Sequence, residues 1–147
     1  GLSDEGLDRK RQVIAAALEK YQLRETEPMR ILCSVGGLDI AGLCGVFLGG
    51  AKYHMPIVAD GVISAVAALT AERLCPGTKE FIIPSHKGKE PASELLMREL
   101  GLYDLTPALC RLDYTMSEAG GVTNFVREYT LASGGSYCDC GYKKKFK

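Results

Sequence analysis

The apolar residues near the start of the chain recur at helical spacing. They predict a helix from Ser3 to Tyr21, with apolar positions at Leu7, Val13, Ile14, Ala17, Leu18 and Tyr21. Ser3 is a suitable N-cap, and Asp4 and Glu5 place acidic side chains in the first turn. A second, short helix is expected from Pro28 to Cys33, because proline is favourable in the first turn of a helix.

Small residues are frequent in the apolar stretch from Leu38 to Tyr53, which follows the pair Gly36-Gly37. Glycine lowers helix propensity, so a loop is one interpretation of this stretch. The other interpretation is a helix whose backbone packs closely against a neighbouring helix or sheet. We favour the close-packed helix.

Strand-like and helix-like segments alternate in the middle of the chain. Residues 56–59 are a short apolar run of the kind found in strands buried on both faces, and residues 81–83 form a second strand. Helices are expected from about Val62 to Leu74 and from Pro91 to Leu100, where Leu95, Leu96 and Leu100 would form the buried stripe. This alternation predicts an α/β fold of three layers, with a short parallel sheet flanked by helices.

The last part of the chain has a weaker pattern. Residues 105–112 are compatible with a third strand or a linker, and residues 122–131 with one more helix. From Ser133 onward the sequence is polar and ends in a basic cluster. We therefore expect a single α/β domain over residues 1–131, followed by a polar tail over residues 132–147.

The composition is that of one ordinary globular domain. The chain has 147 residues, and 18 lysines and arginines balance 18 aspartates and glutamates, so no general charge favours nucleic acid or an acidic membrane surface. No run approaches the roughly 20 apolar residues of a membrane helix, and the polar start has no export signal. We expect a cytoplasmic protein that binds neither nucleic acid nor membranes.

Six cysteines are present, and they fall into two groups. Cys33, Cys44, Cys75 and Cys110 are isolated in apolar sequence, which predicts buried thiols. Cys138 and Cys140 could contribute to a metal site, but two thiols are only half of a structural zinc site. We therefore expect no metal.

Candidate binding residues lie where the predicted strands end, because ligands of open parallel sheets collect there. Gly61 and the run from Ser85 to Pro91 offer backbone amides to an anion, and Gly36-Gly37 does the same before the following helix. Asp60 could hold a ribose hydroxyl or could simply cap the next helix. His86 is a further polar group of this region, whereas Lys10 is either a surface lysine or a phosphate partner.

Glu118, in the sequence Met116-Ser117-Glu118-Ala119-Gly120-Gly121, is the candidate base. If partial burial raised its pKa, it could accept a proton from a ring N–H. The alternative is an exposed glutamate in the first turn of a helix, stabilised by the helix dipole. The residues alone favour this second interpretation.

Several motifs together resemble one family. The segments VGGLDIAG, VADGVIS and SHKGKEP follow one another at the spacing found in nicotinate-nucleotide–dimethylbenzimidazole phosphoribosyltransferases of cobalamin synthesis, and the similarity runs from about Leu2 to Val122. The resemblance implies transfer of ribose phosphate from nicotinate mononucleotide to 5,6-dimethylbenzimidazole or a related base, with no cofactor.

The resemblance also assigns roles to individual residues. Glu118 matches the glutamate that takes the acceptor's proton, and Lys10 matches a lysine that contacts the nucleotide phosphate. Residue pattern and resemblance together give the candidate substrate-binding positions Gly36, Gly37, Asp39, Asp60, Gly61, Ser85, His86 and Gly88. Gly88 stands where the family has a hydroxyl that faces phosphate, which would weaken phosphate binding.

The chain departs from the family in length and at its end. Family members are longer, and their N-terminal part carries further pieces of the site, including a segment GEMGIGNTT with a second glutamate. The last residues, VREYTLASGGSYCDCGYKKKFK, also differ from the family's apolar final helix. The alternative function is therefore a truncated, catalytically incompetent homologue that binds nucleotide weakly or only self-associates. A homodimer is expected, as is usual in the family.

Overall fold

The computed structural model describes residues 3–85, 91–105, 112–130, 134–136 and 141–144. In these ranges no helix is both long and apolar enough to cross a membrane. The elements in chain order are α1 (Asp4–Lys20), α2 (Pro28–Val35), α3 (Leu38–Lys52), β1 (Ile57–Ala59), α4 (Gly61–Leu74), the 3-10 turn η1 (Thr78–Phe81), β2 (Ile82–Pro84), α5 (Pro91–Leu100), the 3-10 turn η2 (Tyr103–Leu105), α7 (Leu112–Gly120), β3 (Thr123–Val126) and β4 (Gly141–Lys144).

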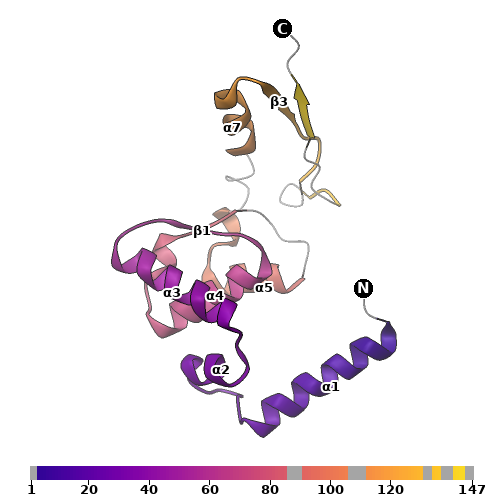
Figure 1. Ribbon diagram of the computed structural model, residues 1–147, viewed down its shortest axis with the longest axis vertical. Coiled ribbons are helices and arrows are strands. Elements are labelled where there is room, and N and C mark those ends of the chain that lie inside the picture. Colours follow the sequence, from indigo (N-terminus) through magenta and orange to yellow (C-terminus); the bar gives the residue numbers. More distant parts are fainter. Residues whose placement is uncertain (1–2, 86–90, 106–111, 131–133, 137–140, 145–147) are drawn as a thin grey trace.

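Helix α1 begins as the sequence predicts. Ser3 is its N-cap, and the Ser3 hydroxyl oxygen accepts a hydrogen bond from the backbone N–H of Gly6 at 3.2 Å. No residue of α1 is buried, and Figure 1 shows the helix projecting away from the other helices. Its apolar stripe, with Val13 at 63% exposure, is therefore left open to solvent.

The small-residue stretch forms helix α3, which confirms the choice of helix over loop. The close packing expected of its glycines is found at Gly50, where a Cβ atom would lie 2.5 Å from Cγ1 of Ile57. Gly42, Gly45 and Gly49 differ, because a Cβ atom at any of them would meet no described atom within 4 Å. One end of α3 therefore packs tightly on β1, while its glycine-rich middle is open.

The predicted short parallel sheet with flanking helices is confirmed. Strands β1 and β2 pair in parallel, with Ile57 opposite Ile82 and Ala59 opposite Pro84. The expectation that the first strand is buried on both faces is wrong at Val58, which is 56% exposed. Side chains alternate between the two faces of a strand, so Ile57 and Ala59 point toward the helices while Val58 points away.

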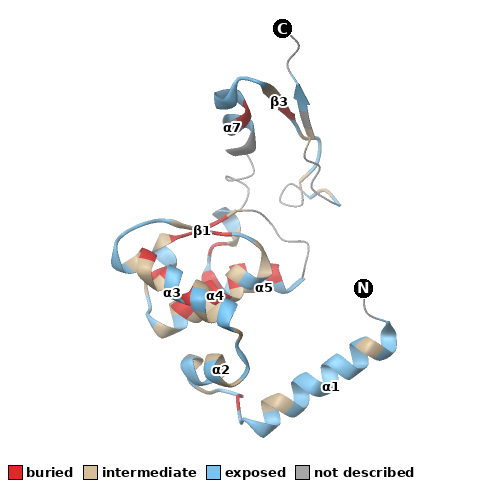
Figure 2. Ribbon diagram, viewed as in Figure 1, coloured by how far each residue is buried: buried red, intermediate tan, exposed pale blue. Residues whose placement is uncertain are grey.

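The hydrophobic core lies among α3, α4, α5 and the sheet, where Figure 2 shows most of the buried residues. Helix α4 contributes four fully buried alanines, Ala65, Ala67, Ala68 and Ala71. Small side chains let the neighbouring helices approach α4 closely, and Phe47 of α3 fills space beside it.

The buried stripe of α5 was predicted correctly in part. Leu100 is buried and Leu96 packs partly buried against the core, but Leu95 is 61% exposed, and Met97 and Ser93 are also buried. Positions 93, 97 and 100 follow the i, i+4, i+7 spacing of one helix face, and position 95 lies on the opposite side. The helix is therefore rotated relative to the orientation that its leucines suggested.

The prediction of a helix over residues 122–131 is wrong. Residues 123–126 form β3, which pairs antiparallel with β4 from the polar end of the chain. Phe125, the buried residue of β3, packs edge-on against Tyr114 of α7 with ring centroids 4.8 Å apart. The pairing partner is far away in sequence, so local pattern could not reveal it. Of the segment predicted as strand or linker, residues 106–111 lie outside the described residues, and Leu112 begins α7.

The prediction of buried cysteines holds for Cys44 and is wrong for Cys33 and Cys75, which are exposed. Cys75 is the C-cap of α4, at a point where the chain leaves the helix, and Cys33 lies on α2, which has no buried residue. Burial raises the pKa of the Cys44 thiol. Cys110, Cys138 and Cys140 lie outside the described residues.

Candidate active site

Asp60 and Ser85 meet at the carboxyl ends of the two parallel strands. The Ser85 hydroxyl donates a hydrogen bond to Oδ1 of Asp60 at 2.8 Å. The backbone N–H of Ser85 also donates to the carbonyl of Ala59 at 2.9 Å, which extends the strand pairing by one residue. Residues 25 positions apart in the chain are thus held together by the sheet, at the edge where ligands of parallel sheets bind.

Gly61 begins α4 beside this pair. Its φ of +65° lies in the left-handed region, which glycine adopts without strain. Asp60 is the N-cap of α4 but makes no side-chain hydrogen bond to the helix, so the alternative role of Asp60 as a capping side chain is not realised. The first N–H groups of a helix have no partners within the helix and carry a partial positive charge, which suits an anion.

Ser64 belongs to the same turn, although the sequence had not suggested it. Its hydroxyl donates to the backbone carbonyl of Asp60 and to that of Gly61, the second at 3.1 Å. These bonds tie the first turn of α4 to the end of β1 and so stabilise the left-handed bend at Gly61. A hydroxyl four residues after Asp60, at helical spacing, was the signal available in the sequence.

Gly36, Gly37 and Asp39 lie together at the junction of α2 and α3. Gly36 is the C-cap of α2 and Gly37 the N-cap of α3, and the exposed Asp39 is in the first turn of α3. A Cβ atom at Gly36 would lie 2.5 Å from the carbonyl oxygen of Leu32, so glycine permits the close reversal between the two helices. The backbone N–H of Gly36 already donates to the carbonyl of Leu32 at 3.0 Å, so the expectation that this amide binds an anion is wrong, and only the amides after it, at the start of α3, suit a ligand.

Lys10 and Glu118 are not brought to the sheet edge. Lys10 is an exposed residue of α1, the helix that projects from the body. Glu118 is on α7, which Figure 1 places with β3 and β4 at the other end of the long axis from α2. His86 and Gly88 lie outside the described residues.

Glu118 occupies the last turn of its helix rather than the first. Helix α7 ends at Gly120, and the backbone carbonyl of Glu118 accepts a hydrogen bond from the N–H of Gly121 at 3.1 Å. Glu118 is exposed, so the interpretation of an exposed glutamate is correct, but its placement in a first turn is wrong. A carboxylate near a helix C-terminus is disfavoured by the helix dipole, so the dipole does not explain this glutamate.

The residue before Glu118 is anchored, which the sequence had not suggested. Ser117 is buried, and its hydroxyl donates to the carbonyl of Thr123 at 2.9 Å and lies 3.1 Å from the Thr123 hydroxyl. These contacts join the end of α7 to the start of β3 across the turn at Gly121. They fix the backbone on both sides of Glu118.

Known proteins resemble this chain over most of its length. The family profile described as Phosphoribosyltransferase matches residues 1–125. The chain belongs to this family. Among relatives, the nicotinate-nucleotide–dimethylbenzimidazole phosphoribosyltransferase of Clostridium acetobutylicum is 48% identical over 109 residues, which are 74% of this chain and 30% of that protein. The protein of the same name from Halalkalibacterium halodurans is 43% identical over 121 residues, or 82% of this chain and 33% of that protein.

Solved structures agree with the family assignment. The chain matches the crystal structure of CobT from Thermus thermophilus with a TM-score of 0.63 and 32% identity, over 69% of this chain and 30% of that one. The chain thus spans about a third of the length of the relatives it matches. The similarity establishes the family and the fold of this part.

Proposed function

We propose that this chain forms part of an enzyme that transfers ribose phosphate from nicotinate mononucleotide to 5,6-dimethylbenzimidazole or a related base in cobalamin synthesis. The observation that carries the proposal is the Asp60–Ser85 pair beside Gly61, at the ligand-binding edge of a parallel sheet in a member of this family. The names of the two relatives include both the nicotinate nucleotide and dimethylbenzimidazole.

In the proposed reaction the bond between C1′ of the ribose and the nicotinate nitrogen breaks, and nicotinate leaves with the bonding electrons. The lone pair of one benzimidazole nitrogen forms the new bond to C1′, and the N–H on the other nitrogen loses its proton. We assign that proton to the Glu118 carboxylate on the resemblance to the family's glutamate, and this role requires α7 to approach the sheet edge more closely than it does in this chain alone. General base catalysis of this kind contributes roughly 100- to 10,000-fold to a rate.

The sheet edge suits the nucleotide part of the substrate. The carboxylate of Asp60 can accept hydrogen bonds from ribose hydroxyls, while the amides at the start of α4 suit phosphate. The amide at Gly37, Asp39 and the side chain of Lys10 are further candidate contacts, as are His86 and Gly88. No cofactor or metal is required, because positioning and proton transfer supply the chemistry.

The proposal is tested by nicotinate release. The chain is incubated with nicotinate mononucleotide and 5,6-dimethylbenzimidazole, alone and together with the part of the Clostridium acetobutylicum relative that this chain does not cover. We expect nicotinate and the ribosylated base to appear in equal amounts when both parts are present. Release in neither mixture would contradict the proposal and favour an incompetent homologue that only binds nucleotide or self-associates.

Glu118→Gln tests the proposed base. It keeps the size and exposure of the side chain but removes its basicity, so we expect a loss of kcat of at least about 100-fold. Glu128→Gln is the matched control, because Glu128 is also exposed and lies beyond β3. Equal activities of the two variants would remove Glu118 from this role.

Asp60→Asn and Ser85→Ala test the proposed nucleotide contacts. Ser85→Ala removes the donor of the 2.8 Å hydrogen bond, whereas Asp60→Asn removes the negative charge and turns one acceptor oxygen into a donor; we expect KM for nicotinate mononucleotide to rise about tenfold in each. Unchanged KM values in both would place the nucleotide elsewhere.

We further propose that the protein acts in the cytoplasm as a homodimer. Exposed apolar side chains support self-association, since Leu38 at the start of α3 is 94% exposed and Val13 and Ile14 on α1 are more than half exposed. Analytical ultracentrifugation tests the dimer, and a single monomeric species at micromolar concentration would contradict it.

A further inference from the structure

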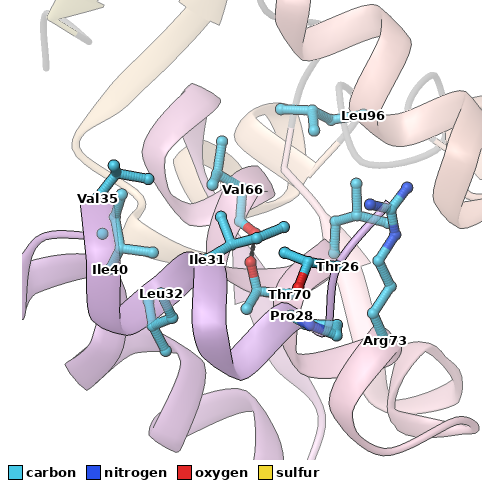
Figure 3. Close-up of a pocket in the computed structure, with 12 residues that line it drawn as sticks. Thr26, Pro28, Ile31, Leu32, Val35, Ile40, Val66, Thr70, Arg73 and Leu96 are labelled. Atoms are coloured by element: carbon cyan, nitrogen blue, oxygen red, sulfur yellow. Dashed lines mark hydrogen bonds between the residues drawn. The ribbon is translucent and has the colours of Figure 1, made fainter. Parts of the chain in front are cut away.

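A pocket separate from the sheet edge opens between α2 and α4. It has a volume of about 300 Å³ and is closed on its sides by the start of α3 and by α5. Its walls are largely apolar, formed by Ile31, Leu32, Ile40, Val66, Leu69 and Leu96. Figure 3 shows Arg73 and Leu96 on one side of the pocket and Leu32, Val35 and Ile40 on the other. Small-molecule sites typically range from roughly 300 to 1,000 Å³, so the pocket suits a small ligand.

The pocket has few polar side chains, and the charged one among its described lining residues is Arg73. Arg73 lines it with a guanidinium group, and Thr26 adds a hydroxyl that can donate. The Thr70 hydroxyl already donates to the carbonyl of Val66 at 2.8 Å, so it presents acceptor capacity only. Among the described lining residues there is no acidic side chain.

The guanidinium of Arg73 remains available to a ligand. Its nearest acidic partner is Glu99, 3.9 Å away between Nη2 and Oε2, and both side chains are more than half exposed. Ion pairs of this length and exposure contribute little, so a ligand carboxylate can displace Glu99. A carboxylate can in addition accept two parallel N–H bonds from the guanidinium, which the pair with Glu99 does not form.

We propose that this pocket binds a small carboxylate with a flat apolar body. The apolar body would lie on Ile31, Val66 and Leu69, and the carboxylate would bind Arg73. A benzene ring with one carboxylate is small enough for a volume of about 300 Å³. The pocket shares Gly36 with the candidate substrate-binding residues, but Asp60, Gly61 and Ser85 of the sheet edge do not line it, so it is a different place from the sheet edge.

The test uses benzoate, with benzamide and benzylamine as neutral and cationic probes of the same shape. Binding is followed by the methyl NMR signals of Ile31, Ile40, Val66 and Leu69 in the 147-residue chain. We expect benzoate to shift these signals in the millimolar range, with benzamide weaker by about five- to tenfold and benzylamine without effect. Equal shifts by all three probes, or no shift by benzoate, would overturn the proposal.

Two variants locate the site. Arg73→Gln should weaken benzoate to the level of benzamide, whereas Arg9→Ala, which removes an exposed arginine from α1, should leave it unchanged. Val35→Trp places a large ring at the pocket from a position that is already 49% exposed, so the fold is kept while benzoate binding is lost. Full benzoate affinity in Arg73→Gln or in Val35→Trp would contradict the assignment. Because the readout is binding alone, its failure is distinct from a failure of transferase activity.

Discussion

Helices α3, α4 and α5 with the parallel sheet enclose a hydrophobic core, whereas α7 with β3 and β4 buries one large apolar residue among its described side chains, Phe125. The first region carries Asp60 and Ser85, and the second carries Glu118. The first is held by side-chain packing over several elements. The second is held by the Ser117–Thr123 contacts, the β3–β4 pairing and one aromatic pair.

This difference assigns different tasks to the two regions. A packed core fixes the sheet edge, which suits a site that must hold a nucleotide in one position. A region with few buried apolar contacts opens locally at lower free energy. We therefore expect the proposed base to stand on the less stable part of the molecule, and four predictions test the packing of the first region and its independence from the second.

Phe47→Ala should have the largest effect on stability. Phe47 is 2% exposed in the core, and removal of a buried phenylalanine costs about 3–5 kcal/mol. Denaturant unfolding followed by circular dichroism measures the change. Val46→Ala, one residue away but 49% exposed, is the control and should cost less than about 1 kcal/mol. Similar losses in the two variants would mean that α3 does not pack as described.

Phe125→Ala should destabilise only the second region. The ring packs on Tyr114, and its loss removes the apolar contact between α7 and β3, at a local cost of about 2–4 kcal/mol. Hydrogen exchange measured by mass spectrometry should show faster exchange over residues 112–126 and unchanged exchange in α4. If both regions exchanged faster by the same factor, they would unfold as one unit and the comparison would fail.

Gly50→Ala and Gly45→Ala should have opposite effects on the same helix. The new Cβ atom at position 50 would meet Ile57 at 2.5 Å and the Met55 carbonyl at 2.9 Å, so we expect a loss of about 1–3 kcal/mol. At position 45 no described atom lies within 4 Å, and alanine should add up to about 1 kcal/mol of helix stability. Denaturant midpoints measure both changes. A loss at position 45 would show that its open face is occupied in solution.

The smallest expected effect concerns the rate at which the cysteine thiols react at a given pH. Burial raises the pKa of Cys44 above its ordinary value of 9.0, so its thiolate forms at higher pH than in an unfolded chain. Iodoacetamide at about pH 8 to 9 should therefore modify the exposed Cys33 and Cys75 before Cys44. The associated stability is fully present below the unfolded pKa and is lost as pH rises through the folded value. Modification of Cys44 at the same rate as Cys75 would contradict its burial.

Much of the first region could be predicted because the sequence features that define its helices and strands lie within those elements or next to them. The Ser3 cap, the helix-stopping positions and the two short apolar runs each depend on neighbouring residues, and the structure has these elements in the expected order. The meeting of Asp60 with Ser85 followed from the rule that parallel strands end at one edge. The role of these residues in binding stays a prediction.

The predictions were wrong where residues distant in sequence determine the local structure. Leu95 is more hydrophobic than Ser93, yet the contact of α5 with α4 buries Ser93 and exposes Leu95. Residues 123–126 are a strand because β4, at the other end of the tail, supplies their hydrogen-bond partners. The pattern up to residue 112 indicated a strand or a linker, so Glu118 was expected in the first turn of a later helix. The helix in fact begins at Leu112, which puts Glu118 in its last turn.

The sequence by itself determined the order of helices and strands in the first region and, through its motifs, the family. Both depend on the spacing of residues along the chain. Only the tertiary structure decided which face of α5 is buried, that α7, which carries Glu118, lies apart from α3, α4 and α5, and that Arg73 lines an apolar pocket between α2 and α4. These features arise from contacts between elements, and a contact depends on how helices are rotated and packed, which spacing along the chain does not specify.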